Sequence, residues 1–336
     1  MTTTQPTNNA KSPSDPAAQW NGLSVTYPGL GCMGLSGAYG PIDEAESRAV
    51  VNSYLDAGGN LLDTADFYAA GHNERLIGEV LRERNRDDVV LSVKFGVMLS
   101  PDGISGFDAR PEAVRNAISY SLQRLGTDYI DIYRPARLDP DVPIEETVGA
   151  VSELVDAGYV RRIGLSEVNA DTIRRAASVA PINDLQIEYS LLSRGIEDEI
   201  LGTCRELGIG ITAYGVLAKG LIGGSSSADG ARAAFPRFQG ANREHNAALA
   251  DRLQELADAK GASRAEVAIA WVAAQDESIV PVVGSRRPDQ LQTMISSSRV
   301  SLDTDELARI EELIPRGAAH GDRYPTEHMA ALDSER

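Results

Sequence analysis

The chain has 336 residues, a formal net charge of −17 and a pI of about 4.7, with 42% hydrophobic and 24% charged residues. This composition is globular, and the length allows one large domain or two ordinary ones. An acidic surface repels a phosphate backbone, so we expect no nucleic-acid binding. No apolar run approaches the ~20 residues that cross a bilayer, so we expect no membrane contact. The two cysteines, Cys32 and Cys204, offer no disulfide framework and favour a reducing cytoplasm.

The first 20 residues are rich in Thr, Pro, Asn and Ser and lack the apolar core of a signal peptide. We therefore expect a mobile N-terminal tail over 1–20, with the folded domain over 21–315.

Short apolar or β-branched runs alternate with amphipathic helical patterns along the rest of the chain. The strands are expected to start near Leu30, Asn60, Val89, Tyr129, Arg161, Leu185, Gly210 and Ile279. Most of the gaps suit one strand plus one helix, and the longer gap before Ile279 must hold extra elements. Eight such alternations predict an α/β fold of the (β/α)₈ TIM-barrel type, with a doubly wound sheet as the second possibility.

Three of the intervening helices are defined by their apolar stripes and their ends. They are expected over 110–126, 144–158 and 196–208, each closed by a glycine.

The segment GLGCMG (29–34) matches the dinucleotide-binding pattern G-x-G-x-x-G. Pro28 stands where the preceding strand should run, and the next helical pattern starts only near Asp43, so the context disfavours that interpretation. We interpret the segment as a first barrel strand whose small residues let a ligand approach closely.

Metal and nucleophile chemistry have little support. The four histidines show no ligand spacing, so no metal site is expected, and the chain has neither a P-loop nor a G-x-S-x-G elbow.

The segment LLDTADFYAAG (61–71) places Asp63, Asp66 and Tyr68 where the second strand ends, and Lys94 ends the third. In a barrel, reactive residues lie at the carboxyl ends of the strands, so these side chains should meet. A protonated lysine stabilises a phenolate, and Asp63 can keep Lys94 charged. Asp63, Lys94 and Tyr68 therefore form a coherent proton-delivery unit, whereas Asp66 is expected to be a solvated loop carboxylate.

A proton donor aimed at a carbonyl needs a hydride source. A barrel could hold the nicotinamide carboxamide with Ser166 and Gln186 and stack the ring on Tyr214. The run VVGSRRPDQ (282–290) places arginines before a helix start, which favours the 2′-phosphate of NADPH over NADH. The alternative is a capped surface helix with solvated arginines.

The Gly/Ser-rich segment 223–240 is too long for a simple connection. Long loops in compact domains tend to be lids or disordered, and we favour a lid.

Several motifs together resemble the aldo-keto reductase superfamily over about residues 21–315. They are GLGCMG (29–34), LLDTADFY (61–68), NERLIGEVL (73–81), VKFG (93–96), IGLSE (163–167), LQIEYS (185–190), AYGVLAKGLIGG (213–224) and PVVGSRRPDQL (281–291).

The resemblance implies a (β/α)₈ barrel that reduces a small-molecule aldehyde or ketone with NADPH, or oxidises the alcohol in reverse. It implies Tyr68 as general acid, tuned by Lys94 and Asp63. The cofactor residues that it implies are Cys32, Met33, Asp63, Ser166, Gln186, Tyr214, Gly215, Val216, Leu217, Gly220, Leu221, Gly284, Ser285, Arg286 and Gln290. No protein partner can be read from the sequence.

Three departures from the family's pattern stand out. Ala136 occupies the place of a fourth catalytic residue, a histidine, in DIYRPARLDP (131–140). Glu167 replaces an asparagine, and Thr293-Met294 replaces a Glu-Asn pair at the adenine end.

The loss of the imidazole at Ala136 leaves three alternatives. Water or Arg137 takes its role, the freed volume admits a bulkier or cyclic ketone, or the fold binds NADPH as a regulatory or interaction protein with slow turnover. The expected substrate pocket comprises Tyr68, Ala136 and Arg137, and the C-terminal segment 316–336 either lines it or is a disordered tail.

Overall fold

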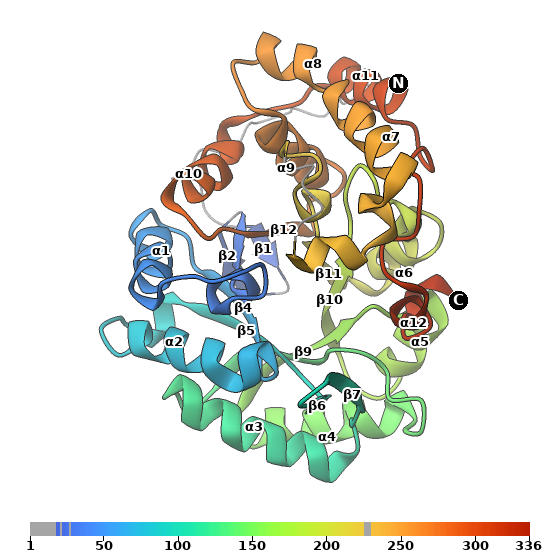
Figure 1. Cartoon of the computed structure of the whole chain (residues 1–336). Helices are drawn as coiled ribbons and strands as arrows, with labels where there is room; N and C mark the ends of the chain where they lie inside the picture. The colour runs from blue at the N-terminus through green and yellow to red at the C-terminus, as the bar shows by residue number, and fades with distance from the viewer. Residues whose placement is uncertain (1–17, 21, 27, 225–229) are drawn as a thin grey trace, which may run out of the picture.

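The computed structural model describes all residues except 1–17, 21, 27 and 225–229. Eight parallel strands form a closed barrel with helices around it (Figure 1), in the order β10-β11-β12-β3-β4-β5-β8-β9, which confirms the predicted (β/α)₈ barrel. The barrel strands are β3 (Gly29–Gly31), β4 (Leu61–Ala65), β5 (Val90–Phe95), β8 (Ile130–Pro135), β9 (Val160–Ser166), β10 (Ile182–Glu188), β11 (Gly210–Tyr214) and β12 (Ile279–Gly284).

Helices follow each strand and form the outer layer. They are α1 (Glu44–Asp56), α2 (His72–Leu81), α3 (Pro111–Leu125), α4 (Ile144–Asp156), α5 (Ala170–Ala177), α6 (Ile200–Leu207), α7 (Gly240–Asp251), α8 (Gln254–Ala259), α9 (Arg264–Ala274), α10 (Pro288–Ser296), α11 (Thr304–Leu313) and α12 (Thr326–Met329). Between β11 and β12 lie α7, α8 and α9, the extra elements expected there. None of the helices in the described part of the chain has the length and hydropathy to span a bilayer.

Local signals explain most element ends. α3 begins with Pro111 at its first turn and ends before Gly126, which adopts a left-handed φ of 65°. α6 starts at Ile200, later than expected, because Gly195–Glu197 form a separate 3₁₀ turn. β10 starts at Ile182, earlier than expected, and its register shifts between Ile182 and Asp184. That irregularity and its polar residues hid the start of the strand from the apolar pattern.

The barrel interior changes from apolar to polar along the strands. Side chains two residues apart on a strand point the same way, so each inward residue sits one layer above the last. The floor is a buried apolar cluster of Val25, Leu61, Val90, Ile132, Val280 and Val282. Two residues further along three of these strands come Asp63, Ser92 and Arg134, all buried. The polar groups of the site therefore stand on an apolar base.

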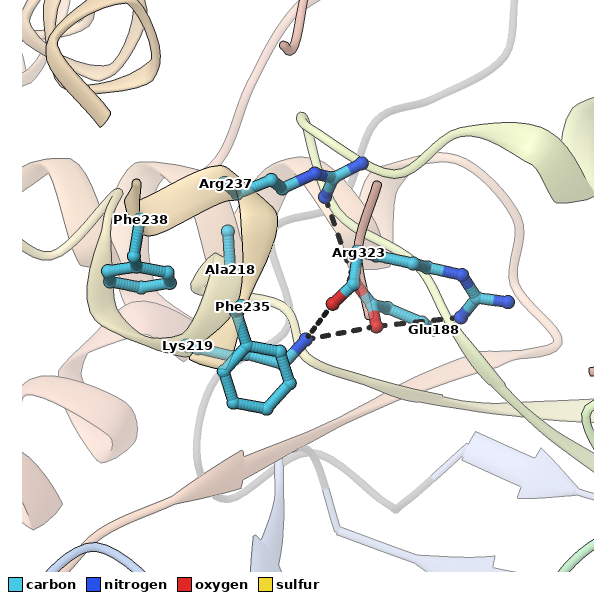
Figure 2. A pocket seen from close by; sticks show the side chains of 7 residues that line it. All are labelled: Glu188, Ala218, Lys219, Phe235, Arg237, Phe238 and Arg323. Carbon is cyan, nitrogen blue, oxygen red and sulfur yellow. Dashed lines mark hydrogen bonds and ion pairs between the residues drawn. The ribbon is translucent and has the colours of Figure 1, made fainter. Parts of the chain in front are cut away.

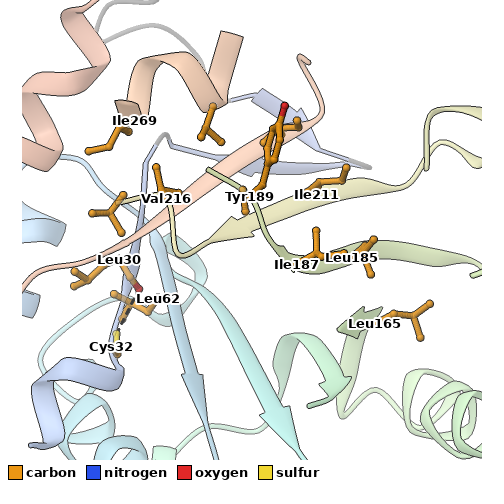
Figure 3. Close-up of a cluster of buried hydrophobic side chains, with 14 of the residues drawn as sticks. Leu30, Cys32, Leu62, Leu165, Leu185, Ile187, Tyr189, Ile211, Val216 and Ile269 are labelled. Atoms are coloured by element: carbon orange, nitrogen blue, oxygen red, sulfur yellow. Dashed lines mark hydrogen bonds between the residues drawn. The ribbon is translucent and has the colours of Figure 1, made fainter. Parts of the chain in front are cut away.

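The outward faces of the strands pack against the helices. Figure 3 shows part of this core, including Leu165, Leu185 and Ile211 from three successive strands, all fully buried. Burial on both faces explains why the strands read as nearly continuous apolar runs.

The start of β3 has no room for a side chain at Gly29, because Leu61 of the neighbouring strand fills the space. A Cβ at Gly29 would lie 2.6 Å from Leu61 Cδ2. The expectation that small residues make room here for a ligand is therefore wrong at Gly29. The dinucleotide-fold alternative is also excluded, because β3 pairs with β12 and β4 in the closed barrel.

Two antiparallel hairpins are additional to the barrel. β1 (Ala18–Trp20) pairs with β2 (Leu23–Val25), and β6 (Val97–Ser100) pairs with β7 (Gly103–Phe107). The tail boundary expected after residue 20 falls inside the first hairpin, and residues 1–17 lie outside the described part. Such short strands give too few residues for a periodic pattern.

Replacing Gly78 by alanine is expected to destabilise the fold by about 1–3 kcal/mol, because the new Cβ would lie 2.6 Å from Arg124 O and 2.8 Å from Leu125 O at the α2–α3 contact. The matched control is Gly149→Ala in α4, where no atom lies within 4 Å of the new Cβ. The control should gain about 0.5–1 kcal/mol from helix propensity. Urea unfolding of both variants checks this, and equal effects would contradict the proposed backbone clash.

Candidate active site

The centre of the candidate site is an ion pair between Lys94 on β5 and Asp63 on β4. Lys94 Nζ donates to Asp63 Oδ2 at 2.7 Å and to Thr64 O at 2.9 Å. Asp63 Oδ1 accepts from Ser92 Oγ at 2.8 Å and from Gln186 Nε2 at 2.7 Å. Asp63 thereby links three strands of the barrel, and the position of its carboxylate is set by three hydrogen-bonded groups.

Both charges of this pair are buried and compensate one another. Burial would raise the pKa of Asp63, but the charges of Lys94 and Arg134 outweigh it and lower that pKa. Burial lowers the pKa of Lys94, and Asp63 opposes the shift. Lys94 therefore depends on Asp63 to keep its proton.

Tyr68 follows β4 in a short 3₁₀ turn, η2 (Tyr68–Gly71), and the Lys94 Nζ lies 5.0 Å from its ring centroid. The expected proximity of Asp63, Lys94 and Tyr68 is thus present. The expected electrostatic effect differs, because burial, followed by Asp63, raises the pKa of Tyr68, and Arg137 is the cation that lowers it. Asp63 neutralises Lys94, so the pair as a whole does not favour the phenolate. The phenol keeps its proton at neutral pH.

The three residues expected around a nicotinamide end neighbouring strands. Ser166 ends β9, Gln186 lies near the end of β10, and Tyr214 ends β11. Ser166 and Gln186 pair in register, and Gln186 pairs with Thr212 on β11. Ser166 Oγ is buried and has no hydrogen-bond partner among the described residues. A buried hydroxyl without a partner is costly, so this one is suited to a bound ligand.

The loop after β11 contains the residues expected along a pyrophosphate: Gly215, Val216, Leu217, Gly220 and Leu221. Its backbone turns sharply in η5 (Ala218–Gly220), where Ala218 and Lys219 have φ of 48° and 57°. Left-handed conformations cost non-glycine residues of order 1 kcal/mol and cluster at functional sites.

Glu188, at the end of β10, forms ion pairs with three basic residues from separate segments beside this loop (Figure 2). It lies 3.4 Å from Lys219, 3.5 Å from Arg323 and 3.8 Å from Arg237, and it accepts a hydrogen bond from Ser193 at 2.7 Å. Burial would raise the pKa of Glu188, but these cations outweigh it and lower that pKa. One carboxylate thus faces three positive charges, of which Arg323 is also paired with Glu167 and Glu335.

Part of the expected 223–240 lid covers this region. Arg232 Nε donates to Lys219 O at 2.8 Å, and Arg237 Nη1 donates to Ser193 Oγ at 2.6 Å. The Phe235 ring lies 5.7 Å from that of Tyr324. Residues 225–229 lie outside the described part, so these contacts describe only the second half of the segment.

The C-terminal segment is joined to the site by a buried ion pair. Arg323 Nη2 lies 2.6 Å from Glu167 Oε2, which also accepts from Ser334 Oγ at 2.7 Å. Glu167 Oε1 accepts from the Tyr214 hydroxyl at 2.7 Å, and the Tyr324 hydroxyl lies 3.0 Å from that of Tyr214. Burial would raise the pKa of Glu167, but Arg323 outweighs it and lowers the pKa to about 2. The substitution for asparagine at Glu167 thus has a partner 156 residues further along the chain.

The residues expected at the adenosine end of the cofactor differ in exposure and in hydrogen bonding. Gly284 ends β12 exposed, whereas Ser285 is buried and its Oγ lies 3.7 Å from Met294 Sδ. Arg286 donates to the carbonyls of Tyr39, Gly40 and Pro41, and its backbone N–H donates to Gln290 Oε1. The neighbouring Arg287 pairs with Asp289. These arginines stand at the start of α10 as expected, but both already have partners within the chain.

Cys32 and Met33 follow β3. The Cys32 N–H donates to Asp63 O at 2.9 Å, and its thiol is fully buried, which raises the thiol pKa. Met33 begins η1 (Met33–Ser36) and is partly buried. Contact of Cys32 with a cofactor would therefore involve its backbone rather than a thiolate.

Ala136 follows β8 at the mouth and is 2% exposed, and its N–H donates to Phe95 O. Arg137 comes next, half-buried, and Nη1 donates to Ala136 O at 2.6 Å. His72, the nearest histidine in sequence, contacts Ser36 at 3.0 Å and so faces η1. Among the described residues, no group of three or more His, Cys, Asp or Glu side chains could hold a metal ion.

Asp66 is not the solvated carboxylate that the sequence suggested. Its Oδ1 is buried without a hydrogen-bond partner among the described residues, close to Glu74, which is 0% exposed. Burial, then the charge of Glu74, raises the pKa of Asp66 to about 7, and Arg124 opposes the shift. Asp66 is thus partly buried beside charged residues of α2 and α3, which periodicity alone did not reveal.

Comparison with known proteins identifies the family of this chain. The model of the aldo/keto reductase family matches residues 29–315. The probable aldo-keto reductase 1 of Glycine max is 40% identical over 309 residues, covering 90% of this chain and 89% of the relative.

Solved structures give the same picture. The glycerol dehydrogenase AKR11B4 from Gluconobacter oxydans superposes with a TM-score of 0.83 at 26% identity, covering 93% of this chain and 98% of the other. An aldo/keto reductase from Klebsiella pneumoniae in complex with NADP and acetate has a TM-score of 0.73 at 26% identity, with 92% and 98% covered. The chain belongs to the aldo/keto reductase family, and its general class is therefore that of the oxidoreductases.

Asp66→Asn is expected to raise the free energy of unfolding more at pH 8 than at pH 5. The folded-state pKa of about 7 exceeds the ordinary value of 3.8, so the stability from protonated Asp66 is complete below about pH 4 and is lost as the pH rises to 7. The asparagine cannot ionise and escapes this loss. Urea unfolding at both pH values tests it, with the exposed Asp102→Asn as control. A pH-independent difference would contradict the burial of an ionisable Asp66.

Arg323→Met is expected to destabilise the protein by about 3–5 kcal/mol, because it leaves Glu167 buried without its cation. The double variant with Glu167→Gln should lose less than the sum of the two single variants. Arg110→Met, which breaks the exposed pair with Asp108, is the control and should leave the stability almost unchanged.

The stabilisation by the Arg323–Glu167 pair should depend on pH in a definite direction. Its stabilisation is present above the ordinary glutamate pKa of 4.5 and is lost as the pH falls toward the folded value of about 2. The difference between wild type and Arg323→Met should therefore shrink between pH 5 and pH 3. Additive effects in the cycle of Arg323 and Glu167 variants would show that the two side chains are not coupled.

Proposed function

We propose that this protein is an NADPH-dependent reductase of aldehydes and ketones, with the alcohol oxidation as the reverse reaction. The observation that carries the proposal is the placement of Tyr68 against the buried Lys94–Asp63 pair, at the carboxyl ends of β4 and β5. Reactive residues of barrel enzymes lie at this end. Family membership supports the same reaction class.

A nicotinamide cofactor fits the residues present. The partnerless hydroxyl of Ser166 and the amide of Gln186 would hold the carboxamide, and Tyr214 would support the ring. The cations around Glu188 would face the phosphates. Bound NADPH would supply the hydride for the carbonyl carbon. The related structure from Klebsiella pneumoniae, which is in complex with NADP, supports this cofactor for the present chain.

Our preference for NADPH over NADH rests on Arg286 and Arg287 before α10. Their guanidinium groups bind backbone carbonyls and Asp289. A 2′-phosphate would have to share these donors, and charge-assisted bonds to phosphate are the stronger ones.

Tyr68 would donate the proton to the substrate oxygen. Its raised pKa keeps the phenol protonated, which is the form a general acid needs. Asp63 holds Lys94 under the ring, and Arg137 is the cation that eases release of the proton.

Ala136 is the specific observation behind two further proposals. Its methyl group is smaller than the imidazole of the family's pattern, and this difference in size is the basis for proposing a bulkier or cyclic ketone substrate. The loss of one hydrogen-bond donor to the reacting oxygen typically costs ~10²–10³ in turnover. The second candidate function is therefore an NADPH-binding regulatory or interaction protein with slow turnover.

Two further proposals concern the substrate pocket and the cellular location. Tyr324 and Arg323 support a pocket partly formed by the C-terminal segment. The two free, buried cysteines support a reducing, cytoplasmic location.

Tyr68→Phe is expected to lower kcat for 4-nitrobenzaldehyde reduction by about 10²–10⁴, because it removes the proton donor. NADPH binding, measured by quenching of protein fluorescence, should be retained. The control is Tyr120→Phe, which removes an exposed hydroxyl on α3 and should leave turnover unchanged. Full activity in Tyr68→Phe would overturn the assignment. Tight NADPH binding with no turnover in the wild type would favour the second candidate.

A further inference from the structure

Arg137 stands at the mouth of the barrel directly beside Ala136. It follows the end of β8, whose Pro135 pairs in register with Phe95, the residue after Lys94. The guanidinium is half-buried, and its one hydrogen bond to a described residue is from Nη1 to Ala136 O at 2.6 Å. Most of its five N–H donors therefore remain available.

The positive charge of Arg137 affects the pKa of three tyrosines of the candidate site. It lowers the pKa of Tyr68 and acts in the same direction on Tyr214 and Tyr324, against the larger effect of burial. Tyr68 follows β4 and Tyr214 ends β11, so both lie at the same end of the barrel as Arg137, which follows β8. The hydroxyl of Tyr324 lies 3.0 Å from that of Tyr214.

Three other cations of the candidate site have carboxylate partners. Lys94 lies 2.7 Å from Asp63, Lys219 lies 3.4 Å from Glu188, and Arg323 lies 2.6 Å from Glu167. Arg137 has no carboxylate within 4.0 Å in the described part of the chain. The charge of Glu167 raises the pKa of Arg137, but the ion pair that Glu167 forms is with Arg323.

A half-buried guanidinium without an anion has lost part of its hydration and gained no ion pair in return. Its planar fork matches a carboxylate or phosphate in two parallel hydrogen bonds. Because the whole chain carries a net charge of −17, an anionic ligand gains nothing from the overall field and must be held locally.

We propose that Arg137 forms a subsite for an oxyanion group of the substrate, so that the preferred substrates are aldehydes or ketones bearing a carboxylate or phosphate near the carbonyl. This inference rests on the proposed reductase function and names its substrate class. A role for Arg137 in orienting the carbonyl itself predicts a different result, namely an equal loss for every substrate.

The test compares matched substrate pairs in wild type and variants: benzaldehyde with 3- and 4-carboxybenzaldehyde, and glyceraldehyde with glyceraldehyde 3-phosphate. In the wild type, kcat/KM for the charged member of a pair should exceed that for the neutral member by about tenfold or more. Arg137→Met should bring the ratio to about one, and Arg137→Lys should keep part of it. The pair with the larger ratio distinguishes carboxylate from phosphate.

Arg232→Met is the matched control for the general field of the mouth. Arg232 also lacks a carboxylate partner among the described residues, but it binds Lys219 O, and its guanidinium carbon lies 5.9 Å from the Tyr39 ring centroid. The ratios should survive in this variant. Ratios near one in the wild type, or unchanged ratios in Arg137→Met, would overturn the proposal, and so would an equal loss for charged and neutral substrates.

A binding measurement separates the subsite from the reaction. Benzoate titrated calorimetrically into the protein, with and without NADP⁺, should bind at least tenfold more weakly to Arg137→Met than to the wild type. Equal binding would overturn the subsite. If the wild type reduces none of the aldehydes, the reductase function fails, and the benzoate titration still decides whether Arg137 binds a carboxylate.

Discussion

The ion pair between Asp63 and Lys94 is the interaction around which the site is built. A buried carboxylate is tolerated only when its charge is compensated and its oxygens are hydrogen-bonded. Asp63 meets both conditions through Lys94, Ser92 and Gln186, which come from β5 and β10. The same bonds that make the charge tolerable fix the positions of the strand ends, so the stability of the pair and the geometry of the candidate site have one cause.

A second buried ion pair, between Glu167 and Arg323, joins the C-terminal segment to the candidate site. Glu167 accepts hydrogen bonds from Tyr214 and from Arg323, so the candidate nicotinamide platform and the C-terminal segment share one carboxylate. Glu167 itself has a φ of 54°, and the loops at Ala69 and Lys219 are also left-handed. Backbone strain is thus concentrated in three loops at the mouth, where tertiary contacts hold it in place.

The sequence was sufficient for the barrel and for the centre of the site, for identifiable reasons. Strands buried on both faces give continuous apolar runs, and Asp63, Lys94 and Gln186 stand out as polar residues inside them. The partner of Glu167 could not be found in the same way, because Arg323 lies in an irregular segment far along the chain. Periodicity also says nothing about which helix covers a loop, and for that reason the burial of Asp66 was missed.

The joining of Glu167 to Arg323 also has an evolutionary consequence. An acid at 167 without an arginine at 323 would leave a buried carboxylate without its cation, whereas Arg323 also pairs with Glu188 and Glu335. Relatives that carry an acid at the position of Glu167 should therefore carry a cation at 323, although 156 residues separate the two positions. The length and course of the C-terminal segment would then diverge within the family together with the residue that follows Ser166.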